Sequence, residues 1–389
     1  MNMKKKLTNI FIIVFWIVLI SSTSVFAQNW DKSTPEKEGV DAGVLKSIHK
    51  DIEDGRYGLI DHFLVIKNGN IIADHSYVQD YETIALEYDT TNDQYNYDHP
   101  DWHPFYKGTN LHSLQSVTKS ITSALLGIAI DEGLIKSTDI NPMMMFHGYD
   151  QDIDPRRLAI TLHDLLTMRS GIQWNEMISY DSNENSCIMM EAADDWIQFV
   201  LSQPMKNDPG TVFNYNSGVS VLLGKLVRNA TGKRIDKWAE EKLFGPLGIT
   251  EYYWKETPLG EIDTEGGLYL SSHDLAKIGY LFLQDGKWGG TQIISKEWVQ
   301  KSTSPIIPDI SPNNNRKDRG WGYGYQWWVP LNENGTTKLF AGNGYGGQFL
   351  MVSPEHDLVV VFNGWNIHSG SELSSRMATQ DRILPAIKN

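Results

Sequence analysis

The chain has 389 residues, of which 41% are hydrophobic and 21% are charged, and its formal net charge at neutral pH is −14. This composition is typical of a globular protein with one large domain or two of average size. A chain of this length buries enough apolar surface to fold without a disulfide or a structural metal. A strongly acidic surface repels nucleic acids and anionic lipids, so neither is an expected partner.

Residues 1–27 have the composition of an export signal. Three lysines at positions 4–6 precede a mostly apolar run over residues 7–20, and Ala27 is a small residue that suits cleavage before Gln28. The run is shorter than the roughly 20 apolar residues that cross a bilayer, so we expect cleavage; a retained anchor is the alternative. The remaining region, residues 28–389, is then expected to be periplasmic or secreted, without stable membrane insertion.

Cys187 is the only cysteine in the chain. A single cysteine excludes an intramolecular disulfide, even in an oxidising compartment. No histidine is clustered with it in the sequence, so we interpret Cys187 as a buried thiol rather than a nucleophile.

The first elements expected after the signal are a helix and a hairpin. Apolar residues at helical spacing predict a helix over residues 41–52. Residues 62–77 have the pattern of two strands joined at Asn68-Gly69, a strong two-residue turn signal. Residues 80–111 are polar and aromatic without helical or strand periodicity, which predicts a long loop of the kind that often carries function.

Helices are predicted to fill the middle of the chain. Residues 116–130 are apolar and small, which predicts a mostly buried helix. Residues 162–169 predict a second helix, with Thr161 as its N-cap and Ser170-Gly171 as its C-terminal signal. Four further segments have helical periodicity: 194–201, 219–231, 236–243 and 272–284.

Strand patterns return near the C-terminus. They occupy residues 320–329, 338–352 and 358–364, and a final helix is expected over residues 371–387. Strands thus lie towards both ends of the chain, with helices between them. We therefore predict an α/β fold of the α+β type: one antiparallel sheet from the N- and C-terminal parts, flanked by helices, with an inserted helical subdomain over roughly residues 130–300.

The strongest chemical signal is Ser116-Val-Thr-Lys119, at the start of the buried helix. A serine hydroxyl needs a base to act as a nucleophile, and a lysine three residues later lies on the same helix face. Burial lowers the pKa of a lysine, which would make Lys119 a neutral amine and a competent base. Backbone N–H groups at the helix start can also stabilise an oxyanion. The alternative is an N-capping serine and a lysine that extends to solvent.

A second copy of this spacing, Ser47-Ile-His-Lys50, serves as an internal control. It lies in the amphipathic helix expected over residues 41–52, and no small apolar helix follows it. We expect this copy to be a solvated helix face without a chemical role. Only Lys119 comes from a segment that must be buried, and a buried lysine is rare unless it has a partner or a specific role.

Two other motifs could complete a site around Ser116. Tyr215-Asn216-Ser217 precedes the helix at 219–231, and a Tyr215 phenolate beside Lys119 could relay a proton from Ser116 to a leaving group and later activate water. Residues 341–348 contain four glycines, which let another backbone approach closely. An N–H of Tyr345 or Gly346 could then complete an oxyanion hole with that of Ser116. Taken alone, the alternatives are a structural loop tyrosine and a bulged edge strand.

In type and order, these three motifs resemble those of the serine β-lactamase and DD-peptidase superfamily. The likeness is to its class C-like branch, which includes esterases and 6-aminohexanoate-dimer hydrolases. It covers nearly all of the mature chain, through the segments 115–120, 162–171, 209–211, 266–277 and 353–360. The resemblance implies a β-lactamase/transpeptidase-like fold and an acyl-enzyme on Ser116, with Lys119 as base, Tyr215 as proton relay and no cofactor.

Two departures from the family pattern bear on the substrate. Ser217 stands where the family usually has asparagine, and Asn343-Gly344-Tyr345 stands where β-lactamases and DD-peptidases carry a lysine or histidine that meets the substrate carboxylate. We therefore expect a small ester, amide or peptide-like substrate, with Ser217, Asn343 and Gly344 as candidate contacts. The alternatives are a DD-carboxypeptidase or β-lactamase acting on cell-wall-like substrates, and a non-catalytic binding protein of the same fold.

Aromatic and histidine residues have two interpretations each. Trp174 and Trp327 either wall a substrate pocket or belong to the core. His99, His103 and His112, with Asp98 and Asp101, have a spacing that matches no metal-binding motif. We therefore expect no metal site there, and interpret these residues as part of a polar loop beside the site.

Overall fold

The structure is a computed structural model, and it describes residues 30–80, 83–84, 86, 109–150, 154–310, 320–331, 339–367 and 370–388. The expected export signal at 1–27 lies outside the described residues. So does most of the expected loop at 80–111, including His99, His103, Asp98 and Asp101. No helix within the described residues has the length and apolarity needed to cross a membrane.

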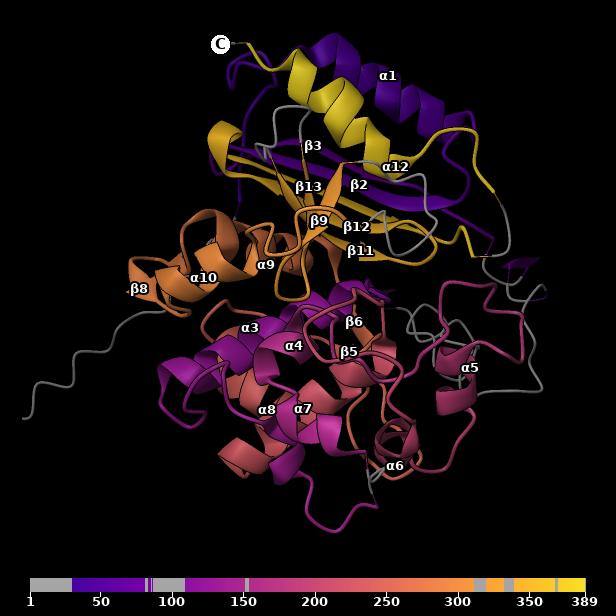
Figure 1. Cartoon of the computed structure of the whole chain (residues 1–389). Coiled ribbons are helices and arrows are strands. Elements are labelled where there is room, and N and C mark those ends of the chain that lie inside the picture. Colours follow the sequence, from indigo (N-terminus) through magenta and orange to yellow (C-terminus); the bar gives the residue numbers. More distant parts are fainter. Residues whose placement is uncertain are drawn as a thin grey trace, which may run out of the picture.

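An eight-stranded sheet, counted over the described residues, forms the centre of the molecule (Figure 1). Its strands lie in the order β1-β3-β2-β13-β12-β11-β10-β9. Their bounds are β1 Asp31–Lys32, β2 Ile60–Lys67, β3 Asn70–Ser76, β9 Trp321–Tyr323, β10 Trp328–Pro330, β11 Phe340–Gly344, β12 Gln348–Ser353 and β13 Leu358–Gly364. β1 runs parallel to β3, and the other neighbouring pairs are antiparallel. Because β2 pairs with β13, both ends of the chain build one sheet, which confirms the prediction.

The predicted hairpin at Asn68-Gly69 is confirmed. β2 ends at Lys67 and β3 begins at Asn70, so the connection has two residues. Asn68 has a φ of 52° and Gly69 a φ of 75°. Positive φ at both positions gives the turn a twist that matches the two strands, and asparagine followed by glycine is the sequence that adopts it most readily.

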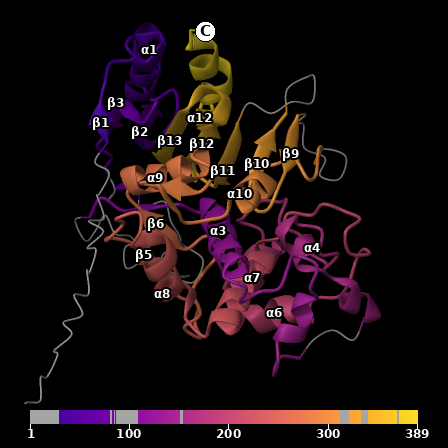
Figure 2. The same ribbon diagram turned by 90° about the vertical axis from the view of Figure 1, so that its left-hand side faces the viewer.

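Helices cover both faces of the sheet (Figures 1 and 2). α1 (Ala42–Glu53) and α12 (Ser375–Met377), with the helical turns that follow α12, lie on one face. α9 (Ser272–Leu283) and α3 (Val117–Asp131) lie on the other. The other helices are α4 Leu162–Leu166, α5 Ser186–Glu191, α6 Trp196–Ser202, α7 Ser217–Thr231, α8 Ile235–Ala239 and α10 Lys296–Ser302. The expected helices at 41–52, 116–130 and 272–284 are confirmed; the final helix begins at Ser375 rather than at residue 371.

Short strands that the sequence did not predict support the start of α3. β4 (His112–Ser113) pairs with β6 (Leu268–Leu270), which pairs with β5 (Tyr253–Trp254). β4 immediately precedes Ser116, so this small sheet fixes the entry to α3. A separate two-stranded hairpin joins β7 (Lys287–Trp288) to β8 (Thr291–Gln292).

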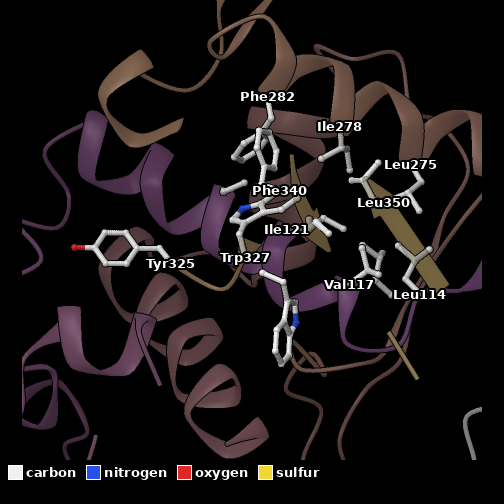
Figure 3. Packing of buried hydrophobic residues seen from close by; sticks show 14 of the residues in the cluster. Leu114, Val117, Ile121, Leu275, Ile278, Phe282, Tyr325, Trp327, Phe340 and Leu350 are labelled. Atoms are coloured by element: carbon white, nitrogen blue, oxygen red, sulfur yellow. The ribbon is translucent and has the colours of Figure 1, made fainter. Parts of the chain in front are cut away.

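A continuous apolar core lies between the large sheet, α9 and α3 (Figure 3). Leu350 of β12 faces Leu275 and Ile278 of α9, and Val117 and Ile121 of α3 lie on the opposite side of the same core. Each residue of α3 from Val117 to Ala129 is buried. Truncating one such side chain to alanine typically costs about 2–5 kcal/mol, so this packing holds α3 firmly against the sheet.

The prediction that the helix after Thr161 ends at Ser170-Gly171 is wrong. Thr161 and Asp164 form the predicted cap as a reciprocal capping box, but α4 ends at Leu166 and Met168 takes a left-handed φ of 58°. Gly171 also has a positive φ, of 77°, for a different reason: a Cβ there would lie 2.3 Å from the Asn207 carbonyl oxygen. Position 171 therefore requires glycine because the backbone of residues 205–207 approaches it closely, and not because a helix ends there.

The expected strand at 320–329 is two strands, β9 and β10, with Gln326 between them at a φ of 63°. The buried Gln326 amide explains this conformation. Its Oε1 accepts a hydrogen bond from Ser220 Oγ at 2.7 Å, and its Nε2 donates to the Leu166 carbonyl at 3.0 Å. The Gln326 carbonyl accepts from Ser120 Oγ at 2.7 Å. One residue thus ties α3, α4 and α7 to the sheet.

Candidate active site

Ser116 stands at the N-cap position of α3, and Lys119 lies one turn further on. The Lys119 Nζ is 2.9 Å from Ser116 Oγ. The Ser116 hydroxyl makes no capping hydrogen bond to its own helix, so the interpretation of Ser116 as a capping residue is wrong. The preceding Gln115 has a φ of 48°, a conformation that costs a non-glycine residue about 1–3 kcal/mol and is often found at functional sites.

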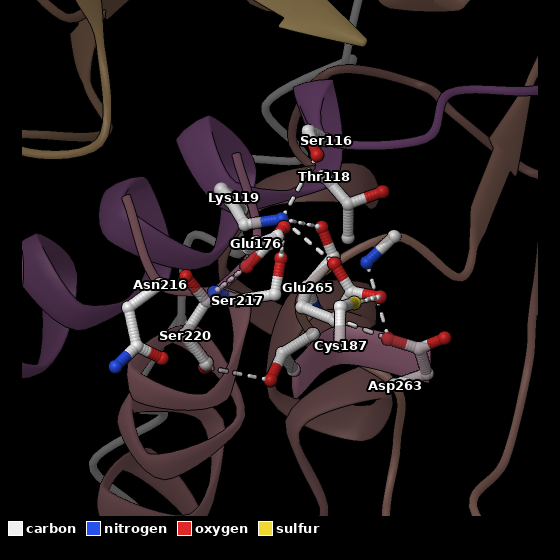
Figure 4. A network of polar contacts seen from close by, with 12 residues as sticks. Ser116, Thr118, Lys119, Glu176, Cys187, Asn216, Ser217, Ser220, Asp263 and Glu265 are labelled. Atoms are coloured by element: carbon white, nitrogen blue, oxygen red, sulfur yellow. Dashed lines mark hydrogen bonds and ion pairs between the residues drawn. The ribbon is translucent and has the colours of Figure 1, made fainter. Parts of the chain in front are cut away.

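Lys119 is almost fully buried, and a carboxylate faces it (Figure 4). Its Nζ lies 2.7 Å from Glu265 Oε2 and 2.8 Å from the Glu265 carbonyl oxygen. With Ser116 Oγ, these acceptors match the three protons of an ammonium group. Burial alone lowers the pKa of Lys119, but Glu265 first, then Tyr215 and Glu176, outweigh it and raise this pKa well above its usual value.

The expectation of a lowered lysine pKa is therefore wrong. Burial acts in the predicted direction, but the sequence argument lacked the Glu265 carboxylate, which stabilises the charged form of Lys119. In the structure Lys119 is an ammonium group paired with Glu265. A neutral Lys119 requires that its proton first move, and Glu265 is the nearest acceptor.

A second buried carboxyl group, that of Glu176, organises the opposite side of the site. Its Oε2 accepts hydrogen bonds from the Trp174 indole at 2.6 Å and from the Ser217 backbone N–H at 2.8 Å. Its Oε1 accepts from Ser217 Oγ at 2.6 Å and from the Tyr180 hydroxyl at 3.0 Å. Burial raises the pKa of Glu176, and Lys119 opposes this rise. Glu176 thereby fixes the start of α7, where Tyr215 and Ser217 lie.

Tyr215 reaches the nucleophile, as predicted. The Lys119 Nζ lies 5.3 Å from the centre of the Tyr215 ring, and the Trp328 ring stacks on Tyr215 at 5.6 Å between centres. Burial raises the pKa of Tyr215, while Lys119 and a hydrogen bond with Ser116 lower it, and the net shift is upward. The prediction of a Tyr215 phenolate is therefore wrong, because this upward shift favours the protonated phenol, the form that can donate a proton.

The glycine-rich strand β11 packs directly against the start of α3. A Cβ on Gly344 would lie 2.4 Å from the Leu114 carbonyl oxygen, and one on Gly342 would lie 2.8 Å from Val117 Cγ1. Both distances are too short for a side chain, so the two glycines permit the contact. The predicted close approach of this strand to another backbone is confirmed. It brings the turn that carries Tyr345 and Gly346 next to the residues before Ser116.

Tyr345 and Gly346, the candidates for the second oxyanion donor, lie in the turn between β11 and β12. The Tyr345 side chain is 44% exposed and its hydroxyl donates to the Ile367 carbonyl at 2.9 Å. Its ring lies 5.0 Å from that of Tyr180. Gly346 pairs with Asn366, to which it offers its carbonyl oxygen. Tyr345 and Tyr180 thus form an aromatic wall beside the site.

Four other predicted substrate contacts are placed differently from expectation. Trp327 is fully buried among Phe282 and Phe340 in the core, so its assignment to a pocket wall is wrong (Figure 3). Trp174 is buried behind the site, where it holds Glu176. The Ser217 hydroxyl is already engaged by Glu176. Asn343 lies between Gly342 and Gly344, and alternation along β11 directs its side chain to the face opposite α3.

The other residues that the sequence analysis considered, Cys187, His112 and the control pair Ser47 and Lys50, make contacts away from Ser116. Cys187 is buried, as predicted, with Sγ 3.8 Å from Glu265 Oε1, and burial raises its pKa well above the usual value. His112 is buried in β4, where its Nε2 lies 3.1 Å from Asp61 Oδ2. The control pair behaves as expected: Lys50 is 71% exposed and pairs with Asp54, while Ser47 accepts a hydrogen bond from Arg382.

Sequence reasoning missed Glu176 and Glu265. Glu265 is 146 positions from Lys119 in the sequence, and no local pattern reports a pairing over that distance. One signal was available: a lysine in a buried helix needs a counter-charge. Glu265 immediately precedes the Gly266-Gly267 segment, and Glu176 follows Trp174 by two positions, so both lay beside residues that had been singled out.

The chain matches one protein family over most of its length. The family model described as Beta-lactamase matches residues 63–366, a range that contains all the site residues above. The 6-aminohexanoate-dimer hydrolase of Paenarthrobacter ureafaciens is 27% identical over 277 residues, which are 64% of this chain and 65% of the relative. A monacolin J acid methylbutanoyltransferase of Aspergillus terreus is 29% identical over 155 residues, 36% of this chain and 37% of the relative. The chain thus spans less than two thirds of the length of these relatives.

Solved structures share the fold at low identity. A Bacillus anthracis protein provisionally named 6-aminohexanoate-dimer hydrolase superposes with a TM-score of 0.68 at 19% identity, covering 91% of this chain and 86% of that one. A family VIII carboxylesterase superposes with a TM-score of 0.63 at 14% identity, covering 92% of this chain and 98% of that one. The predicted superfamily and fold are confirmed, and the chain belongs to the family described as Beta-lactamase.

Proposed function

We propose that this chain is a serine hydrolase that cleaves an ester or amide bond through an acyl-enzyme on Ser116. The observation that carries the proposal is the contact of 2.9 Å between Lys119 Nζ and Ser116 Oγ at the start of a buried helix. Tyr215 and the glycine strand β11 lie beside it. The relatives named for ester and amide hydrolysis support this reaction class.

Acylation begins with a proton moving from Lys119 Nζ to Glu265 Oε2, across 2.7 Å. Desolvation penalises the two charges of a buried pair, so this transfer costs less free energy in the site than it would in water. The neutral amine of Lys119 then takes the proton of Ser116 Oγ as this oxygen attacks the carbonyl carbon. The N–H groups of Ser116 and of Tyr345 or Gly346 stabilise the oxyanion.

Collapse of this intermediate breaks the bond to the leaving group, which takes the Tyr215 proton as it departs as an alcohol or amine. The Tyr215 phenolate then accepts a proton from water, and the resulting hydroxide attacks the acyl-enzyme. The Ser116 oxygen regains its proton from the Lys119 ammonium, and Glu265 returns its proton to Lys119. The raised pKa of Tyr215 suits the first of these roles, because it keeps the phenol protonated until the leaving group forms.

The surroundings of Lys119 favour a substrate without a carboxylate next to the scissile bond. Two buried carboxyl groups, Glu176 and Glu265, lie close to Lys119, and both disfavour a further negative charge. The segment at 343–345, which corresponds in the sequence to the family motif that carries a lysine or histidine, contains no cation. An ester or neutral amide is therefore preferred over a β-lactam or a D-alanyl peptide.

Labelling with a fluorophosphonate probe tests the nucleophile. We expect wild type to be labelled on Ser116, Ser116→Ala to be silent, and Ser47→Ala, the matched control from the second copy of the spacing, to label as wild type does. We expect Lys119→Ala to lower labelling by about 10²–10⁴-fold, the usual contribution of a positioned base. An unlabelled wild type that also leaves p-nitrophenyl esters intact would contradict the proposal.

A substrate panel tests the bond type. The panel contains p-nitrophenyl esters, linear amides, D-amino-acid amides and the β-lactam nitrocefin. We expect turnover of the esters or linear amides and little or none of nitrocefin. Efficient nitrocefin hydrolysis, or trapping of Ser116 by a penicillin, would instead support the β-lactamase or DD-carboxypeptidase alternative.

A further inference from the structure

A cluster of two histidines and one aspartate, separate from Ser116, joins the hairpin of β2 and β3 to α9. His62 Nε2 lies 2.9 Å from Asp74 Oδ1, and His273 Nε2 lies 3.2 Å from Asp74 Oδ2. Each residue offers one ligand atom, a ring nitrogen or a carboxylate oxygen, and these three atoms lie within 4.8 Å of one another. These are the ligand types and the proximity that a divalent transition metal requires.

We propose that His62, Asp74 and His273 form a binding site for a divalent transition-metal ion, with zinc as the expected occupant. Two imidazole nitrogens and one carboxylate oxygen are a common zinc ligand set, and they leave a fourth position for water. When zinc binds, it takes the place of the protons that now link the histidines to Asp74.

The sheet register directs two of the ligands to the same side. His62 pairs with Ser76, and Leu64 pairs with Asp74. His62 and Leu64 are two positions apart on one strand, so His62 and Asp74 project from one face of the sheet as diagonal neighbours. α9 packs on that face (Figure 2), and its first turn supplies His273. Three separate pieces of backbone thus converge on one point.

A contact on the side of the ring that faces away from Asp74 also orients His62. Its second nitrogen, Nδ1, lies 3.2 Å from Ser76 Oγ, which leaves Nε2 directed at Asp74. Metal-binding histidines usually have such a partner on the nitrogen that faces away from the metal, because it fixes the tautomer and the ring plane. The His273 ring meets the His62 ring edge to face, at 5.5 Å between centres.

The cluster is accessible to an ion from solvent. The side chains of His62, Asp74 and His273 are 16%, 23% and 39% exposed, in contrast to the 1% of Lys119. A metal here would connect the hairpin to α9. The chain that enters α9 comes directly from Glu265 through β6, so such a connection would also restrain the segment that pairs with Lys119.

Calorimetric titration of the chelator-treated protein with zinc chloride tests the site. We expect one zinc ion per chain, and a rise in the midpoint of thermal unfolding when zinc is added. The variant His62→Ala/His273→Gln should lose this binding. Ser76→Ala should weaken binding by about 10–100-fold, the usual effect of removing a partner of a metal ligand. Cobalt(II) in place of zinc should give the intense visible absorption of a tetrahedral site with nitrogen ligands.

His75→Ala is the matched control, because His75 lies on the same strand as Asp74 but stacks on His49, on the other face of the sheet. It should bind zinc as wild type does. Fluorophosphonate labelling of Ser116 reports folding of each variant, and His273→Gln alone, at the most exposed ligand, provides the test if the double variant does not fold. Absence of zinc binding by wild type, or equal binding by wild type and the folded ligand variants, would overturn the proposal.

Discussion

Ser116-x-x-Lys119 and Ser47-x-x-Lys50 have the same spacing but different surroundings. Lys50 extends from α1 into solvent and pairs with Asp54 on the same helix. Lys119 is 1% exposed and pairs with Glu265, which comes from the loop before β6. Breaking a buried ion pair by removing one partner typically costs about 3–5 kcal/mol, because the other charge is left in an apolar environment. At the scale of single residues, Glu265 is therefore as important to Lys119 as Ser116 is.

Replacing Glu265 by glutamine tests this pairing. Glu265 is the largest of the effects that raise the pKa of Lys119 against burial, so Glu265→Gln should lower it and move the acidic limb of the kcat/KM profile for ester hydrolysis to lower pH. The raised pKa means that the pair stabilises the fold fully below the unfolded lysine pKa of about 10.4 and loses this effect as the pH rises through the folded value. Unfolding in urea at neutral pH should therefore become easier by about 3–5 kcal/mol.

The matched control for this variant is Glu256→Gln, at a glutamate that is 49% exposed and pairs with Arg234. It should change neither the pH profile nor the free energy of unfolding by more than about 1 kcal/mol. If the profile of Glu265→Gln coincided with that of wild type, Glu265 would not set the protonation of Lys119.

Replacing Tyr215 by phenylalanine separates its roles. Tyr215→Phe should lower hydrolysis of a linear amide by about 10²–10⁴-fold, because an amine leaves only when it is protonated. A p-nitrophenolate leaves without a proton, so rapid mixing with a p-nitrophenyl ester should still show a burst of product, followed by slow turnover of the acyl-enzyme. Loss of the burst itself would assign Tyr215 to the activation of Ser116 instead.

At the scale of helices and strands, features set by neighbouring residues could be predicted from the sequence, whereas features set by contacts between distant residues could not. The Asn68-Gly69 turn and the buried helix after Ser116 could be predicted, because their causes lie within a few neighbouring residues. The end of α4 could not be predicted, because the glycine at position 171 is required by the close approach of the backbone at Asn207 and not by the end of the helix. In the site, Ser116, Lys119 and Tyr215 were found from motifs, whereas Glu176 and Glu265 depend on how distant loops fold together. Trp327 and Trp328 are adjacent, and only the sheet decides which of them stacks on Tyr215.

The contact between β11 and α3 predicts the effect of a single methyl group. Gly344→Ala would place a Cβ 2.4 Å from the Leu114 carbonyl oxygen, so β11 must move away from the residues before Ser116. A displacement of about 1 Å at a catalytic group can cost about 10²-fold in rate. We expect fluorophosphonate labelling to fall by about that factor while the protein remains folded.

Gly370→Ala is the matched control for Gly344→Ala, because a Cβ at Gly370 has no neighbour within 4 Å. It should leave labelling unchanged. Far-ultraviolet circular dichroism of both variants establishes that they are folded. Normal labelling of folded Gly344→Ala would show that β11 does not position the nucleophile.

At the scale of the whole molecule, residues 39–41 meet residues 386–388, close to the C-terminal end of the described chain. The Lys388 N–H donates to the Gly39 carbonyl at 2.8 Å, and the Asp41 N–H donates to the Ala386 carbonyl at 3.0 Å. Val40 and Ile387 form a bridge between these contacts. Early and late segments of the chain are therefore in contact, here and where β2 pairs with β13. We expect the order of strands to be independent of where the chain is opened, provided that the new ends lie in an exposed turn.

A circular permutant tests this independence. Residue 388 is joined to residue 30 by a long, flexible linker of glycine and serine, and the new ends lie between Gly289 and Gly290, in the turn of the β7–β8 hairpin, where added atoms meet nothing within 4 Å. We expect this permutant to fold and to be labelled on Ser116, since exposed turns tolerate new ends. A permutant opened between Gly127 and Ile128, inside buried α3, should fail to fold. Equal failure of both would mean that the order of the segments itself is needed.

The pairing of β2 with β13 also has a consequence for the order in which the protein is made. Ser116 and Lys119 are synthesised early, but Glu265, β11 and β13 follow only after most of the chain has been translated. Contacts between residues so far apart in sequence form slowly, because a long loop must close before they are made. A ribosome-bound or truncated chain thus carries Ser116 and Lys119 without Glu265, β11 or the complete sheet. On the proposed function, we expect such a chain to be inactive until synthesis is complete.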